Sequence, residues 1–64
     1  MTRNDEVVSI AWHQDQPDQF RVTFQSGRND LVSGPRAKAQ ALADDLGLDS
    51  ATDETSKAEW IRKP

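Results

Sequence analysis

Two segments of the chain, residues 7–12 and 19–25, carry large apolar side chains at every second position, and the alternation with polar residues is cleaner in the second segment. Successive side chains of a strand lie on opposite faces of a sheet, so this alternation of β-branched and aromatic residues predicts two half-buried strands. Residues 13–19 between them are polar and contain Pro17, which favours a loop, so we expect the strands to pair antiparallel. The expected inward-facing side chains are Val8, Ile10, Trp12, Phe20, Val22 and Phe24.

A third strand and a helix are expected in the middle of the chain. Residues 31–33 follow a Ser-Gly turn and predict a short third strand, because a three-stranded meander is more stable than a lone hairpin. Residues 35–46 have apolar positions at helical spacing, with Ser33 or Gly34 as the expected N-cap and Gly47 as the left-handed end. The expected apolar stripe of this helix is Pro35, Ala39, Leu42, Ala43 and Leu46.

The tail of the chain fits two structures. Ser50 and Asp53 have the spacing of a capping box, and acid-to-base pairs follow at i, i+4, so we favour a second helix over residues 51–63. Alternatively, residues 57–63 form a fourth edge strand with Trp60 pointing inward. The predicted fold class is α+β: a three-stranded antiparallel meander packed by one helix, with a C-terminal second helix or, alternatively, that edge strand.

Length and composition predict one small domain, residues 1–64, with residues 1–6 frayed. The absence of cysteine excludes disulfides and thiolate metal sites and fits a reducing compartment. Because no apolar run approaches membrane-spanning length, we expect a soluble cytoplasmic protein without a membrane partner. A chain of 64 residues buries only about 60% of its unfolded surface, so a homodimer or docking on a larger protein would stabilise it. Trp12 and Trp60 are expected in the core, each with its indole N–H hydrogen-bonded at the edge.

The charges of the expected helix oppose its dipole. Asp44 and Asp45 fall in its last turn, where the backbone is partially negative and each acid costs roughly 0.3–1 kcal/mol, whereas Arg36 and Lys38 lie at the positive end. Exposed charges can drift freely, but a local conflict without compensation also marks candidate functional surfaces. The candidate partner-binding residues, called here the acidic edge, are Asp44, Asp45, Asp49, Asp53 and Glu54.

The acidic edge contains five acids and no base within residues 44–54, in a chain of net charge −3. Such a surface complements a basic groove and speeds association with it. We therefore expect a non-enzymatic protein-interaction module, for example a small acidic inhibitor or regulator that binds a basic surface of a larger protein. In one form of this hypothesis the edge mimics a nucleic-acid backbone, as small phage-type inhibitors do, and the partner is a nucleic-acid-binding protein.

The alternative function is nucleic-acid binding by the polar face of the sheet around Arg21. A small three-stranded sheet backed by a helix resembles, in outline, the arm-type DNA-binding domains of phage integrases, which implies entry of the sheet into the major groove. Nucleic acid is nevertheless an unfavoured partner, because the chain has too few basic residues to neutralise the phosphates. The candidate contact residues are Arg3, Arg21, Thr23, Gln25 and Arg28.

Catalytic chemistry has little support in this sequence. His13, Asp15 and Asp18 form an H-x-D-x-x-D pattern that could contact a metal, but a catalytic zinc usually takes three ligands from rigid elements, and a polar loop explains the pattern. With one histidine, no cysteine and no glycine-rich phosphate loop, only exposed carboxylates remain for acid–base work. We expect no enzyme activity, no metal and no cofactor.

Overall fold

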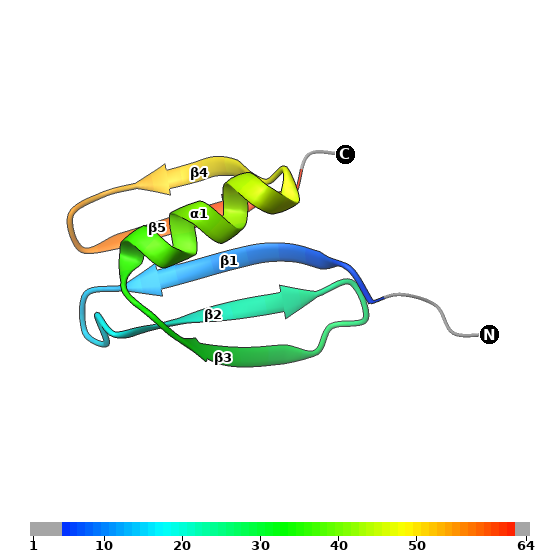
Figure 1. The fold of residues 1–64 in the computed structure, drawn as a ribbon, viewed down its shortest axis with the longest axis horizontal. Helices are drawn as coiled ribbons and strands as arrows, with labels where there is room; N and C mark the ends of the chain where they lie inside the picture. Colours follow the sequence, from blue (N-terminus) through cyan, green and yellow to red (C-terminus); the bar gives the residue numbers. More distant parts are fainter. Residues whose placement is uncertain (1–4, 63–64) are drawn as a thin grey trace.

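The computed structural model describes residues 5–62, which form one antiparallel sheet and one helix. The elements are β1 (Val7–His13), β2 (Gln19–Phe24), β3 (Asn29–Ser33), α1 (Arg36–Leu46), β4 (Asp49–Asp53) and β5 (Lys57–Ile61). The five strands lie in the order β3-β2-β1-β5-β4, so the first strand of the chain is the central one (Figure 1). The helix α1 covers one face of this sheet, and no other element of residues 5–62 covers the opposite face, called here the open face.

The predicted three-stranded sheet with a second helix is wrong. Residues 49–53 and 57–61 form a hairpin of two strands, and β5 pairs antiparallel with β1 from Ser9↔Ile61 to His13↔Lys57. The alternative of a fourth edge strand is also wrong in its position, because β5 lies inside the sheet and β4 forms the edge. Pairing with the central strand β1 outweighs the local capping and charge patterns that favour a helix in the tail.

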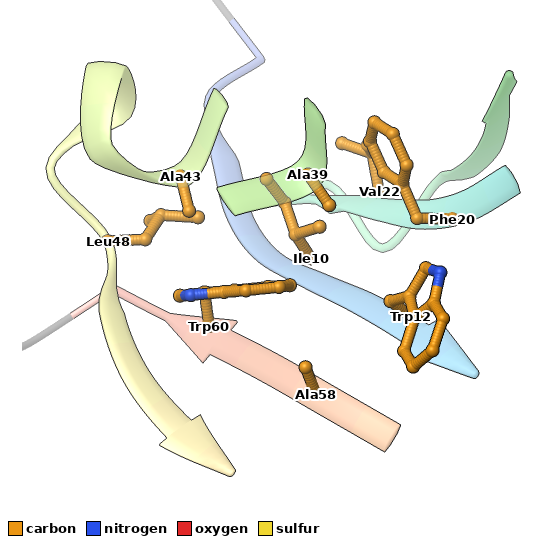
Figure 2. Packing of buried hydrophobic residues seen from close by; sticks show 9 residues of the cluster. All are labelled: Ile10, Trp12, Phe20, Val22, Ala39, Ala43, Leu48, Ala58 and Trp60. Carbon is orange, nitrogen blue, oxygen red and sulfur yellow. The ribbon is translucent and has the colours of Figure 1, made fainter. Parts of the chain in front are cut away.

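The core lies between α1 and the sheet, as Figure 2 shows. Ala39 and Ala43 are fully buried on α1, and their small side chains let the helix lie close to the strands. Leu42 and Leu46 are half-buried beside them and pack against the core, so the predicted apolar stripe is confirmed at these positions. The remaining buried residues come from the sheet and from the turn after α1: Ile10, Trp12, Phe20, Val22, Leu48, Ala58 and Trp60.

The predicted alternation is confirmed along most of β1 and β2, with one exception. Ile10, Trp12 and Phe20 are buried on the α1 side, as expected. At the start of β1, however, the register shifts between Val7↔Phe24 and Ser9↔Thr23, which marks a β-bulge or irregularity. As a result Val7, rather than Val8, packs against the core, because an extra residue in one strand moves the preceding side chains to the other face.

The ends of α1 are set by backbone conformation. Gly47 has φ 75° and lies in the left-handed region, as predicted, and the amide of Leu48 donates to the Ala43 carbonyl at 2.9 Å. The predicted N-cap is wrong: Pro35 occupies that position without a side-chain hydrogen bond, because Ser33 belongs to β3. No side chain caps the first turn, and the amides of Lys38 and Ala39 donate instead to the Pro35 carbonyl at 3.0 and 3.2 Å.

Both tryptophans are buried, as predicted, but only one satisfies its indole N–H. Trp12 Nε1 donates to the Pro17 carbonyl at 3.1 Å, which ties the β1–β2 loop to the core. Trp60 is 2% exposed, and no group within residues 5–62 accepts a hydrogen bond from its Nε1. The expectation of a satisfied indole is therefore wrong for Trp60.

Candidate interaction surfaces

The acidic edge is divided between the two ends of β4. Asp44 and Asp45 lie in the last turn of α1, and the Gly47 turn leads from them directly into β4 at Asp49. Asp53 and Glu54 lie at the far end of β4, four and five residues further along. At about 3.3 Å per residue, β4 separates Asp49 from Asp53 by about 13 Å. The acids thus form one group of three, and one group of two beside the start of α1.

Arg36 connects the start of α1 to the second group. Its guanidinium forms a salt bridge with Asp53, donates to the Glu54 carbonyl at 2.8 Å, and lies over the ring of Trp12, 5.2 Å from the centroid. The side chain thereby holds the β4–β5 turn against the helix. Because Asp53 is paired with a cation, it contributes less negative field to the surface than its formal charge suggests.

The bases at the start of α1 now have structural roles that the sequence alone did not show. Besides the contacts of Arg36, Lys38 Nζ donates to the Ser33 carbonyl at 3.1 Å. The conflict of these two bases with the helix dipole is therefore compensated by bonds to carbonyl and carboxylate oxygens. Such contacts are made between segments distant from each other in the chain or across the turn before α1, so helical spacing cannot reveal them.

Asp44 and Asp45 have no compensating positive charge in their turn of the helix. Both are exposed, and the last turn of α1 contains no basic residue. Asp44 accepts a hydrogen bond from the Gln40 amide at 3.0 Å, whereas no hydrogen bond or ion pair within residues 5–62 holds Asp45. Of the charges that oppose the dipole, only those of these two acids remain without a structural explanation.

The open face of the sheet places Arg21 and Thr23 on one surface, as the alternative hypothesis requires. Leu31 and Ile61 also lie on this face and are 60% and 46% exposed. Sequence reasoning did not identify these two residues as exposed, although both lie at strand positions whose side chains point to the open face. The cross-strand row through Arg21 consists of Leu31, Arg21, Ala11, Glu59 and Thr52.

The remaining residues of the nucleic-acid hypothesis do not extend this row. Arg3 lies outside the described residues, and Gln25 is exposed in the turn after β2. Arg28 is engaged within the chain: its guanidinium lies 4.4 Å from the centroid of the Phe24 ring and within 3.9 Å of the carboxylates of Asp5 and Asp30. A guanidinium with these partners is poorly placed to neutralise a phosphate.

His13, Asp15 and Asp18 do not assemble into a metal site. His13 ends β1, and the two aspartates are exposed in the following loop. No group of three or more His, Asp or Glu side chains within residues 5–62 is placed to hold a metal ion. His13 instead lines a shallow hollow on the open face, together with Ala11, Gln16, Gln19 and Arg21.

Comparisons with known proteins match no family model, no curated protein and no solved structure. Across the part of the chain that the structure describes, no helix has both the length and the apolar character needed to cross a membrane.

Proposed function

We propose that this chain is a non-enzymatic protein-interaction module that binds a basic surface of a larger protein through its acidic edge. The proposal rests on the placement of Asp44 and Asp45, which are exposed at the negative end of α1 without a base in that turn. Asp49 follows them across the Gly47 turn, so three acids lie within six residues at one corner of the molecule. A basic partner would relieve their conflict with the dipole by supplying the missing positive charge.

Apart from the hydrogen bond that Asp44 accepts from Gln40, no described contact gives either acid a structural role. The end of α1 is formed by the backbone of Gly47 and Leu48, not by an aspartate side chain. The dipole makes each acid unfavourable by roughly 0.3–1 kcal/mol, a cost that the fold does not require. An inhibitor or regulator that uses negative charge to find its partner, including one that mimics a nucleic-acid backbone, would retain such residues.

The double variant Asp44→Asn, Asp45→Asn tests this function. Asparagine keeps the size and the acceptor oxygen that Gln40 uses, and it removes the charge. The matched control is Asp15→Asn, Asp18→Asn, which removes two exposed acids from the β1–β2 loop. Proteins captured from the native host by the wild-type chain and the control should be captured weakly by the double variant, and association rates with a purified partner should fall. The difference should shrink as salt is raised, because salt screens the field.

Stability measurements separate this proposal from a role in folding. Relief of the dipole conflict should leave the thermal midpoint of the double variant unchanged or slightly higher than that of the wild type. A lower midpoint would show that the two acids support the fold. Equal capture by all three chains at low salt would disprove binding through this corner.

A further inference from the structure

The two edge strands of the sheet, β4 and β3, differ in how well they are protected against pairing with another chain. At β4 the register shifts between Ser50 and Thr52, and aspartates occupy both ends of the strand. Bulges and edge charges are devices that keep a strand from pairing with another chain. At β3 the register with β2 is continuous from Gln19↔Ser33 to Thr23↔Asn29. The edge at β3 is therefore the one that remains open to pairing.

The backbone groups that β3 turns outward follow from its ladder with β2. The residues that flank β3 both bond toward β2: the Phe24 amide donates to the Arg28 carbonyl at 2.8 Å, and the Gly34 amide donates to the Asp18 carbonyl at 2.7 Å. Bonding alternates along an antiparallel strand, so the amides and carbonyls of Asn29, Leu31 and Ser33 point away from β2. No element of residues 5–62 lies beyond this edge (Figure 1).

We propose that two copies of this chain pair through β3 as antiparallel strands, with Leu31 of each copy opposite Leu31 of the other. Leu31 is the middle residue of β3 and is 60% exposed. In this register each Leu31 exchanges two hydrogen bonds with its counterpart, and Asn29 exchanges two with Ser33 of the second copy. The two sheets become one, and the two leucines cover each other on the open face.

The neighbouring registers are less favourable. A two-fold axis at Asp30 would place two carboxylates directly opposite each other, which is destabilising. An axis at Val32 would leave Asn29 outside the paired region. The Leu31 register uses every outward residue and sets Asp30 opposite Val32 of the second copy, while Arg28 lies 3.8 Å from Asp30 in its own chain.

The surroundings of β3 accommodate a second copy. The helix packs over β1, β2 and β5, so it leaves the β3 side of the sheet uncovered. The Ser33 carbonyl already accepts from Lys38 Nζ at 3.1 Å, and its second lone pair is available to the amide of Asn29 in the second copy. Because the shared edge is only five residues long, the dimer is expected to be weak.

Sedimentation equilibrium of the complete chain at concentrations up to about 1 mM tests the proposal, since even a millimolar dissociation constant gives measurable dimer there. The wild-type mass should rise toward that of a dimer as concentration increases. Leu31→Lys should remain monomeric because it places two ammonium groups face to face. Ile61→Lys is the matched control: it adds the same charge to the same open face but on an inner strand, and it should dimerise as the wild type does.

Amide hydrogen exchange locates the contact independently of any variant. The amides of Asn29, Leu31 and Ser33 should become more protected as concentration rises, whereas the outward amides of β4 should not. A wild-type chain that is monomeric throughout, a Leu31→Lys chain that dimerises equally well, or dimerisation abolished by Ile61→Lys would each overturn the proposal.

Discussion

At the scale of single residues, the two buried tryptophans differ in whether the indole N–H has a hydrogen-bond acceptor. Trp12 donates a hydrogen bond to the Pro17 carbonyl and has the Arg36 guanidinium over its ring. Trp60 is more deeply buried, yet its Nε1 has no acceptor within residues 5–62. A buried donor without a partner costs about 1–3 kcal/mol, so Trp60 stabilises the fold through its apolar surface despite its N–H.

We therefore predict that Trp60→Phe destabilises the chain less than Trp12→Phe does. Both substitutions remove a similar volume from the core, which costs stability in each case. Trp12→Phe additionally loses the hydrogen bond to Pro17, whereas Trp60→Phe removes an unsatisfied donor. The difference in unfolding free energy should be about 1 kcal/mol or more in denaturant melts. The reverse order would show that the Trp60 indole has a partner in solution.

The residues that the sequence predicted correctly are those whose environment follows from strand parity. Ile10, Phe20 and Val22 lie at alternate, inward-facing positions of their strands and are buried. Parity fails at Val8 because the register shift near the start of β1 depends on how that strand meets β2, which no local pattern encodes. Phe24 is only half-buried for a related reason: it lies at the end of β2, where Arg28 covers its ring.

At the scale of elements, the end of α1 depends on one backbone conformation. Gly47 has φ 75°, and a Cβ atom built there would meet nothing within 4 Å. A substitution at this position is therefore opposed by the left-handed backbone alone and not by a steric clash. The turn also sends the chain from α1 into β4, so its geometry positions both Leu48 and the acidic edge.

We predict that Gly47→Ala lowers the unfolding free energy by about 1 kcal/mol, because alanine is strained in the left-handed region. Gly47→Asn should cost less, since asparagine tolerates that conformation better than other residues. Thermal and denaturant melts of the two variants measure both values. An alanine variant as stable as the wild type would mean that the helix ends in another backbone conformation.

The tail shows why an element with local helix signals can form strands. The Ser50 to Asp53 spacing and the acid-to-base pairs describe a helix, and residues 49–53 contain no large apolar side chain to reveal a strand. A period of two is present only in residues 57–61, where Ala58 and Trp60 are buried. Their partners lie on β1, more than forty residues away, so the information that decides the fold is not local. The residues of the acidic edge are close together in the sequence, so they could be grouped from the sequence alone. The contact partners of Arg36 can be identified only in the folded chain.

At the scale of the whole molecule, the two edges of the sheet have different properties. The acidic edge lies with α1 and β4, and the unprotected edge β3 lies on the opposite side of the sheet. Pairing through β3 would keep the acidic edges of two copies apart, at the ends of a continuous sheet. A dimer of this kind would present two binding surfaces to a multivalent basic partner, and simultaneous engagement would raise its avidity without new contacts.

The central position of β1 means that neither half of the chain has a complete core. The segment from β1 to α1 is the three-stranded fold that the sequence predicts, but in the structure β5 pairs with the free side of β1. Leu48 and Trp60 come from the last part of the chain and are 6% and 2% exposed. Burying two such side chains contributes roughly 3–6 kcal/mol. The total stability of a small domain is itself only about 5 kcal/mol or slightly more.

We therefore predict that a chain ending at Gly47 does not fold, although it contains the whole predicted meander and helix. Its denaturant melt should lack a cooperative transition, and Trp12 should fluoresce as in water, whereas a control chain ending at Arg62, which retains β5, should melt cooperatively. Adding a peptide of residues 48–64 should restore the transition, because the peptide supplies the β4–β5 hairpin that covers β1 and completes the core. A cooperative melt of the short chain alone would show that the three-stranded unit is sufficient and that the hairpin only adds to a fold already formed.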